Sequence, residues 1–526
     1  MSRTLLIGLD GATFTVLQPL MDAGVMPFLR SFLETGAAAP LRTIVPALTP
    51  PAWTSLMTGR SPGHHGVFDF FRLESPESNS IRFFSSKDVQ VPTIWALAGE
   101  KGKRVTALNF PSMFPPPQLS GYVVPGWVPW RQLRLACWPD DLFDRLKSDP
   151  AFNARELAMD MKLEERATEG SSDLDEFGPW IEFHIRREKN WYSIFRRLND
   201  EDPSDLTAVL FDGVDKLQHL CWRFIRPEDA SPLETEAERK IRDLCLSYYR
   251  DLDGVLEQMS TAAGPEATIV MASDHGFGPT REVFHVNAWL ELNGYLGWSE
   301  KAKDWDTQGS VLGVGQVAKH TWLLDWDRTR AFAATPTSNG VYLADRTLEG
   351  SGRAALLAEI KSGLLAATDA AGERVVENVW TREEAFDGPA GKTAPDLTLV
   401  MRDGGLISIL PSKEIVVKRE TIGGAHRPVG FFAARGPGIR KGVTLGEQSI
   451  LDVAPLVLYS LGIPIPEDFE GSVPGEQLYE PSALAERPVE HGAATVKLEA
   501  PSSESSMDEE DEAILVERMR ALGYID

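Results

Sequence analysis

Side chains that can bind metal ions stand beside several predicted strands. Carboxylate oxygens and imidazole nitrogens are ligands of Zn²⁺, with Mn²⁺ and Fe²⁺ as alternatives. Asp215 and His219 are four residues apart, a spacing that puts both side chains on one face of a helix, where they can share one metal ion. The remaining candidates border other apolar runs of the chain: Asp10, Asp274, His275 and His426.

The grouping of these residues is more informative than any one of them. Taken singly, Asp-Gly and Asp-His-Gly are turn signals, and an Asp–His pair on a helix is an ordinary surface contact. If the apolar runs are parallel strands, their carboxyl ends meet at one edge of a sheet and bring the candidates together. Two metal ions roughly 4 Å apart at such an edge can clamp the attacking and leaving oxygens of a displacement at phosphorus.

The segment Val45–Val67 offers a hydroxyl nucleophile. It reads VPALTPPAWTSLMTGRSPGHHGV, and Thr49 stands where a helical pattern begins. The simplest role of such a threonine is to cap the helix. A hydroxyl at this position also lies in the positive end of the helix field, where a metal ion can ionise it. It can then attack phosphorus and form a phospho-threonine.

This segment resembles the nucleophile region of the type I phosphodiesterase / nucleotide pyrophosphatase family, within the alkaline phosphatase superfamily. Members read roughly Pro-x-x-Thr-x-Pro, then Thr-Gly, then Pro-x-x-His-Gly. The matching residues here are Pro46, Thr49, Pro51, Thr58-Gly59 and Pro62 through His65-Gly66. The blocks around the metal-ligand candidates follow in the family's order, so the resemblance spans about residues 3–475.

The resemblance implies two metal sites and a reaction. One metal ion is held by Asp10, Thr49, Asp274 and His275, and the other by Asp215, His219 and His426. Thr49 is then both a ligand and the nucleophile. The family's chemistry implies a hydrolase of phosphate esters, foremost a phosphodiesterase, with two divalent ions (Zn²⁺ or Mn²⁺) as cofactors and a small-molecule phosphate ester as substrate.

Other functions stay open at this point. Nucleotide-cleaving relatives place an asparagine shortly after the His-Gly block, whereas Val67–Phe71 has none. The nucleotide pyrophosphatase activity therefore stays open. A phosphomonoesterase is a separate alternative, because the sequence does not settle diester against monoester preference. A sulfatase would need Cys or Ser followed by Pro-x-Arg, which Thr49–Trp53 lacks, and a phosphoglycerate mutase-like enzyme would need a serine nucleophile and a large inserted domain. A non-catalytic scaffold would have lost a ligand, yet all seven positions are filled.

The elements that must position these residues alternate between strands and helices. Apolar runs predict strands at Thr4–Leu9, Val105–Asn109, Leu206–Phe211, Thr268–Ala272, Leu397–Met401 and Val429–Ala434. Helical patterns between them include Leu29–Thr35, Thr93–Gly99 and Arg239–Met259. This alternation predicts an α/β fold with a mostly parallel central sheet and helices on both faces. The resemblance implies that the fold is alkaline-phosphatase-like.

Several segments depart from this alternation. Residues 1–480 are expected to form one catalytic domain, in which the aromatic-rich segments 112–200 and 280–395 are cap insertions. Residues 481–512 are rich in Ala, Pro, Ser and Glu, a composition that predicts an acidic disordered linker. Residues 513–526 carry apolar side chains at helical spacing and predict a C-terminal helix.

The composition excludes some classes of function. The 526 residues include 53 Lys and Arg against 77 Asp and Glu, and a net charge of −24 argues against a nucleic-acid-binding surface. Three cysteines without a CxxC pair suit a reducing compartment. The first apolar run, Leu5–Leu9, is too short for a signal peptide or a membrane span. We therefore expect a cytoplasmic protein without a membrane span.

Overall fold

A large sheet with strand β1 (Thr4–Leu9) near its middle forms the core of the computed structural model. The structure describes residues 3–73, 81–129, 131–157, 174–303, 320–345 and 347–495. Across the sheet the strands follow the order β17 (Val443–Thr444), β2 (Ala37–Arg42), β16 (Val429–Arg435), β8 (Thr268–Ala272), β1, β7 (Leu206–Phe211), β5 (Val105–Leu108) and β6 (Gly121–Val124). A short strand, β18 (Gln448–Ser449), also pairs with β2.

The central strands are parallel, as the sequence predicts. β1 pairs in parallel with both β7 and β8, and β5 pairs in parallel with β7 and β6. All six residues of β1 are buried, which is typical of a parallel strand covered on both faces. β16 runs antiparallel to β8 and β2. The carboxyl ends of β1, β7 and β8 therefore meet at one edge of the sheet.

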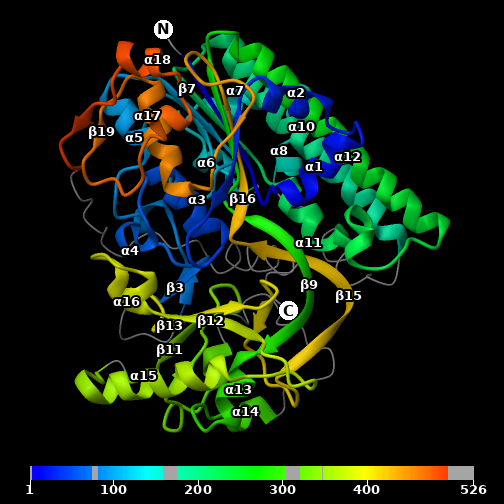
Figure 1. Ribbon diagram of the computed structural model, residues 1–526, viewed down its shortest axis with the longest axis vertical. Coiled ribbons are helices and arrows are strands. Elements are labelled where there is room, and N and C mark those ends of the chain that lie inside the picture. The colour runs from blue at the N-terminus through cyan, green and yellow to red at the C-terminus, as the bar shows by residue number, and fades with distance from the viewer. Residues whose placement is uncertain are drawn as a thin grey trace.

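Helices cover both faces of this sheet (Figure 1). One face carries α1 (Phe14–Asp22), α2 (Pro27–Glu34), α10 (Phe177–Glu201), α11 (Gly213–Ile225) and α12 (Glu236–Ala263), and the other carries α3 (Thr49–Thr58), α5 (Ile94–Glu100) and α17 (Val453–Ser460).

Gly8 in β1 lets α3 approach closely. A Cβ at this position would lie 2.7 Å from the ring of Trp53, a contact too short to accommodate. The predicted α/β fold is thus confirmed.

A second lobe, the cap, extends from the sheet on two long strands (Figure 1). These are β9 (Gly276–His285) and β15 (Val416–Arg427), which pair antiparallel with each other, while β14 (Leu406–Ser408) adds to β9. Beyond them lies a four-stranded sheet in the order β10 (Ala331–Phe332), β11 (Gly340–Leu343), β13 (Leu397–Met401) and β12 (Val376–Thr381), with the helices α13 (Val286–Leu292), α15 (Gly350–Leu365) and α16 (Arg382–Ala385). The cap has its own hydrophobic core.

The cap boundaries differ from those expected from the sequence. The segment 112–200 is not a separate cap, because it supplies β6 to the main sheet and α10 to its covering helices. The segment 280–395 does build the cap, but the cap also takes in β9, β14 and β15. Leu397–Met401 is a strand as predicted, yet it belongs to the cap sheet rather than the central one.

The start of the expected acidic linker also differs from the prediction. Residues 481–486 form helix α18 (Pro481–Glu486), and β20 (His491–Gly492) pairs with β19 (Ile465–Pro466). Thr495 hydrogen-bonds to Asp468. Residues 481–495 are therefore attached to the core by backbone pairing. The rest of the expected linker and the expected C-terminal helix, residues 496–526, lie outside the described residues.

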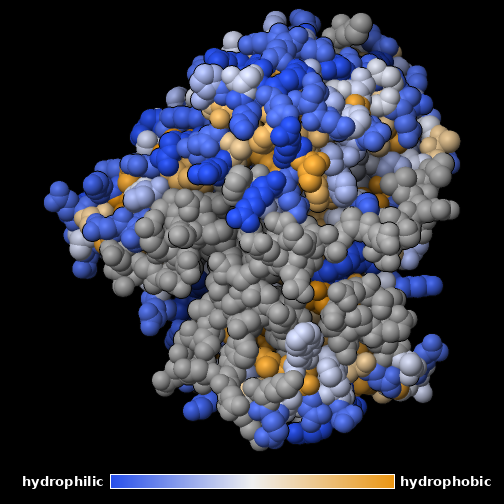
Figure 2. Space-filling view, turned by 180° about the vertical axis from the view of Figure 1, so that it is seen from behind, coloured by the Kyte–Doolittle hydropathy of each residue, from blue (hydrophilic) through white to orange (hydrophobic). Residues whose placement is uncertain are grey.

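The described surface is mostly hydrophilic on the face seen in Figure 2, with a hydrophobic patch in the middle of the larger lobe. Among the described residues, no helix is long and apolar enough to cross a membrane.

Asp69 connects the core to the cap. Its two carboxylate oxygens accept hydrogen bonds from the hydroxyl groups of Thr335 and Thr337, each at 2.5 Å, and both threonines belong to the cap. Burial raises the pKa of Asp69 from 3.8 to about 6, although these hydrogen bonds act in the opposite direction. The folded protein therefore holds the proton of Asp69 more tightly than the unfolded chain does.

This raised pKa predicts a pH-dependent stability. A carboxyl group with a raised pKa in the folded state stabilises that state fully below its unfolded pKa of 3.8, and the contribution is lost as the pH rises through about 6. We expect the melting temperature of wild type, relative to Asp69→Asn, to fall by about 2–4 °C between acidic and neutral buffers. Differential scanning calorimetry checks this, and parallel pH profiles for the two proteins would contradict it.

Candidate metal centre and active site

The candidate residues are brought together by the ends of three central strands. Asp10 directly follows β1, and Asp274 and His275 follow β8 after one serine. Helix α11 begins two residues after β7 and carries the remaining aspartate and one histidine. Gly11 has a φ of 67°, and this turn points its N–H at Asp274 Oδ1, 3.1 Å away. The turn after β1 thus ties two neighbouring strand ends to each other.

The first group of potential ligands consists of Asp10, Asp274 and His275, with Thr49 beside it. One ligand atom from each of the two aspartates and the histidine falls within 4.8 Å of the others. His275 Nε2 lies 3.2 Å from Asp274 Oδ2, 3.6 Å from Asp10 Oδ1 and 3.3 Å from the Thr49 hydroxyl. All four side chains are buried. The structure therefore places a hydroxyl group within contact distance of this group.

The second group consists of Asp215, His219 and His426. His219 Nε2 and His426 Nε2 lie 3.5 and 3.2 Å from Asp215 Oδ1, and 3.1 Å from each other. Asp215 and His219 share a face of α11, as their spacing predicts. His426 comes from β15 rather than from the flexible loop that its glycine-rich surroundings suggest. The two groups adjoin, because His275 Nε2 is only 4.0 Å from Asp215 Oδ1.

Backbone carbonyl groups orient all three imidazole rings. The Nδ1 atoms of His219, His275 and His426 lie 3.1, 3.1 and 2.9 Å from the carbonyl oxygens of Gly424, Gly276 and Ala47. A carbonyl oxygen can only accept, so each Nδ1 must carry the proton and donate it. When the ring carries no second proton, the lone pair of Nε2 points into the centre. This is the arrangement that histidine ligands of metal ions usually have.

The electrostatics of the centre call for positive charge. Burial, followed by repulsion from Asp274 and Asp215, raises the pKa of Asp10 well above 3.8, and burial raises the pKa of Asp274 to about 7. Burial, and next the neighbouring His426, hold the pKa of His275 well below 6.5, so that ring remains neutral. Among the described residues, Asp10 Oδ1 and Asp274 Oδ2 accept no hydrogen bond. These buried acceptor atoms, together with three Nε2 lone pairs, fit divalent metal ions.

Thr49 is the first residue of α3 and does not cap it. The N-cap is Leu48, and no side chain caps this helix. Pro50 and Pro51 have no N–H, and the N–H of Ala52 donates to Leu48 O, so the first turn offers few amide groups to an anion. The helix dipole remains, but this helix end donates fewer hydrogen bonds than a helix start without prolines would. Ionisation of the Thr49 hydroxyl would therefore depend less on the start of α3 than on a metal ion held by Asp10, Asp274 and His275.

The His-Gly part of the nucleophile segment has a structural role. Val67 N donates to His65 Nδ1 at 3.1 Å, so Nε2 carries the proton and donates to the Ser55 hydroxyl at 2.9 Å. His65 is completely buried, and burial lowers its pKa to about 3. This neutral ring links the following turn to the middle of α3. It thereby helps to fix the helix that presents Thr49.

A buried ionic network lies behind the second group, and no sequence pattern indicates most of it. Asp212 precedes α11 and pairs with the guanidinium of Arg187 and, at 3.2 Å, with Lys216 Nζ. Asn109 Nδ2 donates to the same carboxylate at 3.3 Å. Glu188 accepts the N–H of Gly213 at 2.8 Å. These contacts fix the start of the helix that carries Asp215 and His219.

Loss of a ligand should lower the metal content. In His219→Ala or Asp274→Ala, one group retains only two of its three Asp and His side chains, so we expect about two bound ions per chain in wild type and about one in either variant. Inductively coupled plasma mass spectrometry of dialysed protein measures this directly. His64→Ala is the matched control, because His64 lies outside both groups and should leave the metal content unchanged. Two ions retained in both ligand variants would refute the assignment.

Comparison with known proteins agrees with this architecture. The sequence profile described as type I phosphodiesterase / nucleotide pyrophosphatase matches residues 4–427. Murine ectonucleotide pyrophosphatase / phosphodiesterase 5 superposes with a TM-score of 0.50 at 14% identity, over 88% of this chain and 95% of that chain. The human counterpart gives 0.51 at 13% identity, over 90% and 97%.

A more distant similarity is to phosphonoacetate hydrolase from Sinorhizobium meliloti 1021, with a TM-score of 0.48 at 18% identity over 88% of this chain and 95% of that one. The two ectonucleotide pyrophosphatase structures confirm the alkaline-phosphatase-like fold that the sequence resemblance implies. The family profile covers the parallel strands β1, β5, β6, β7 and β8, helix α11 and all seven candidate residues. This chain therefore belongs to the type I phosphodiesterase / nucleotide pyrophosphatase family.

Proposed function

We propose that this phosphoric ester hydrolase works with two divalent metal ions and with Thr49 as its nucleophile. The observation that carries the proposal is the pair of adjoining ligand groups with the Thr49 hydroxyl 3.3 Å from His275 Nε2. The first ion would be held by Asp10, Thr49, Asp274 and His275, and the second by Asp215, His219 and His426. Bound there, the ions would supply Lewis acidity and neutralise charge on the phosphoryl group.

The protein's own residues prepare the hydroxyl for attack. Thr49 is completely buried at the start of α3, so it has few orientations and little competing water. His275 Nε2, a ligand atom of the first group, lies 3.3 Å from this hydroxyl, so the hydroxyl belongs to the same set of potential ligand atoms. Attack on phosphorus would form an Oγ–P bond, release the alcohol of the ester and leave a phospho-threonine, which water then hydrolyses.

The ligand atoms favour Zn²⁺, with Mn²⁺ as the alternative. Three imidazole nitrogens join three carboxylates in the two groups, and mixed nitrogen and oxygen ligation suits Zn²⁺. A site for Mg²⁺ or Ca²⁺ would be expected to use oxygen ligands throughout. The oriented Nε2 atoms therefore support zinc as the ion to test first.

The charges around the centre support a diester substrate. The cations that the structure places beside the second group, Lys216 and Arg187, both pair with Asp212. Their charge is therefore partly neutralised and is not free to hold the second negative charge of a phosphate monoester. A diester carries only one negative charge on its phosphate group, so it needs fewer cationic side chains around it. We therefore place phosphodiesterase ahead of phosphomonoesterase.

A sulfatase and a non-catalytic scaffold are both less well supported than a hydrolase of phosphate esters. A sulfatase would lack its starting residue, because threonine stands at position 49. A scaffold would not be expected to preserve two complete ligand groups with oriented imidazole rings. An inactive threonine-to-alanine variant of the murine protein has been described in complex with AMP. That observation concerns the murine protein. The corresponding experiment on this chain is the Thr49→Ala substitution.

Replacing the nucleophile should abolish turnover. In Thr49→Ala we expect hydrolysis of bis-p-nitrophenyl phosphate to fall at least about 1000-fold, because covalent transfer has no other hydroxyl in this position. Wild type should hydrolyse this diester faster than p-nitrophenyl phosphate in the presence of Zn²⁺ or Mn²⁺. Steady-state rates on both esters measure these effects.

The control for this experiment is the fold and metal content of the variant. Circular dichroism should match that of wild type, and at least one ion should remain bound. Retained turnover in a folded Thr49→Ala variant would remove the nucleophile assignment. A faster monoester reaction in wild type would reverse the substrate preference.

A further inference from the structure

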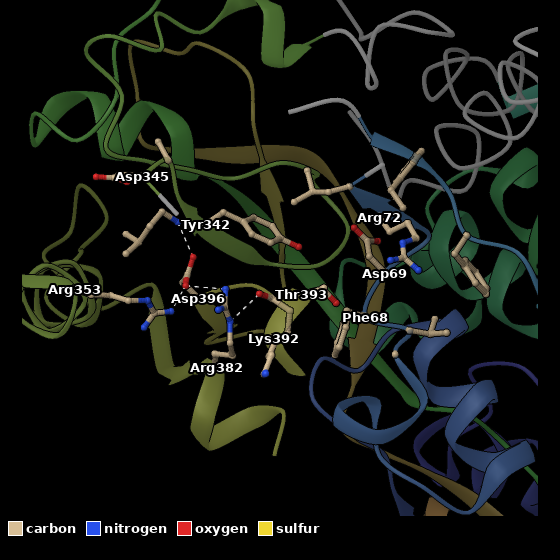
Figure 3. A pocket seen from close by; sticks show the side chains of 18 of the residues that line it. Phe68, Asp69, Arg72, Tyr342, Asp345, Arg353, Arg382, Lys392, Thr393 and Asp396 are labelled. Atoms are coloured by element: carbon tan, nitrogen blue, oxygen red, sulfur yellow. Dashed lines mark hydrogen bonds and ion pairs between the residues drawn. The ribbon is translucent and has the colours of Figure 1, made fainter. Parts of the chain in front are cut away.

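A cavity of about 650 Å³ lies between the core and the cap (Figure 3). Its core wall is formed by residues 66–69, which directly follow His65, by residues 71–73 and by Phe84. Its cap wall comes from β11 and the segment after it, from α15 and α16, and from residues 392–396. The lining includes neither Thr49 nor any of the Asp and His residues of the two ligand groups. The cavity is therefore separate from the metal centre.

One end of the cavity is positively charged. Asp396 is buried, and its Oδ2 accepts the N–H of Leu343 at 2.7 Å while its Oδ1 pairs with the guanidinium groups of both Arg353 and Arg382. Figure 3 shows the two arginines beside Asp396 at the same end of the cavity. Two cations that share one carboxylate leave one positive charge in excess. Both arginine side chains are 22% exposed, so their remaining N–H groups can reach a ligand.

Lys392 adds to this positive end. It lines the cavity, is exposed, and pairs with no carboxylate among the described residues. The nearest additional acid to Arg353 is Glu383 at 3.8 Å, and that side chain is 67% exposed and solvated. The charge of this end is therefore only weakly compensated, although the chain as a whole carries −24.

The carboxylates elsewhere in the cavity already have partners. Asp69 lies at the opposite end, where the hydroxyl groups of Thr335 and Thr337 occupy its oxygens. Beside it, Arg72 pairs with Asp88. Asp345 lies on the arginine side of the cavity in Figure 3, where it is exposed and accepts hydrogen bonds from Thr347. Among the described residues, none of these three carboxylates forms an ion pair with Arg353, Arg382 or Lys392.

Aromatic side chains line the space between the two ends. In Figure 3, Tyr342 lies between the arginine end and Asp69, and Phe68 lies beside Asp69. Phe68 is held in place by an edge-to-face contact with Phe386, and Phe71 packs on Phe83. An apolar wall with a few converging charged groups is the usual construction of a small-molecule site. Such walls favour a flat ring over an extended polar chain.

We propose that this cavity binds a small organic phosphate or phosphonate that carries a ring. The anionic group would contact Arg353, Arg382 and Lys392, where guanidinium groups can donate paired hydrogen bonds. The ring would pack against Phe68 and Tyr342. The occupant is either the remote part of the ester substrate, in which case the inference rests on the proposed function, or a separate molecule with the same chemistry.

Titration of phenylphosphonate into metal-loaded wild type by isothermal calorimetry tests the proposal. We expect two sites per chain, one at the metal centre and one in the cavity. Arg353→Met and Lys392→Met should each weaken the cavity site about tenfold, because each removes one charged contact. Arg382 continues to pair with Asp396 in Arg353→Met, so the fold should be preserved. Lys361→Met, on the same helix but outside the cavity lining, is the matched control.

The ring contact is tested separately. Phenylphosphonate should bind the cavity more tightly than methylphosphonate in wild type, and Tyr342→Leu should reduce this difference. A single site per chain, with affinity unchanged in both Arg353→Met and Lys392→Met, would mean that phenylphosphonate binds only at the metal ions and would overturn the proposal.

Turnover of a phosphodiester whose remote ester group is a phenyl ring that carries a phosphonate, measured with the same samples, distinguishes the two sources of the ligand. A KM raised in Arg353→Met with kcat unchanged would place part of the substrate in the cavity. An unchanged KM with the cavity site weakened would make the occupant a separate molecule. If wild type shows no turnover but the cavity site is present and is lost in the variants, the proposed function fails while this inference stands.

Discussion

Three carboxylates buried close together are the constraint on which the rest of this structure depends. Asp10, Asp215 and Asp274 are each about 1% exposed and lie among three imidazole rings that direct lone pairs toward them. Such a concentration of acceptors costs folding free energy unless cations balance it, and the raised pKa values of Asp10 and Asp274 express that cost. Metal binding at these residues would therefore increase the free energy of unfolding.

The fold meets this constraint with rigid elements. Parallel strands deliver two aspartates and a histidine to one edge of the sheet, and Gly8 lets α3 bring Thr49 against them. The long strand β15 serves twice, because it supplies His426 to the centre and carries the chain back from the cap. The cap then adds a cavity whose positive end contrasts with the acidic chain. The candidate metal centre and the cavity thus depend on different elements of the fold.

Local patterns predict much of this arrangement, and tertiary pairing accounts for the rest. Short apolar runs that end in Asp predict β1 and β8, and a four-residue spacing predicts the shared face of Asp215 and His219. No local pattern could show that His426 lies in a strand, since its pairing with β9 joins residues about 150 positions apart in the chain. Arg187 is likewise joined to Asp212 only by packing of α10. A buried strand such as β13 looks the same in sequence whether it joins the core sheet or the cap.

Trapping the covalent intermediate tests the role of Thr49 most directly. The metal-loaded enzyme would be mixed with bis-p-nitrophenyl phosphate, quenched in acid within the first turnovers, digested and analysed by mass spectrometry. We expect one substrate-derived phosphoryl adduct, located on Thr49, that disappears as substrate is exhausted. Rapid product release with no adduct on Thr49, or with the adduct on another residue, would contradict a phospho-threonine mechanism.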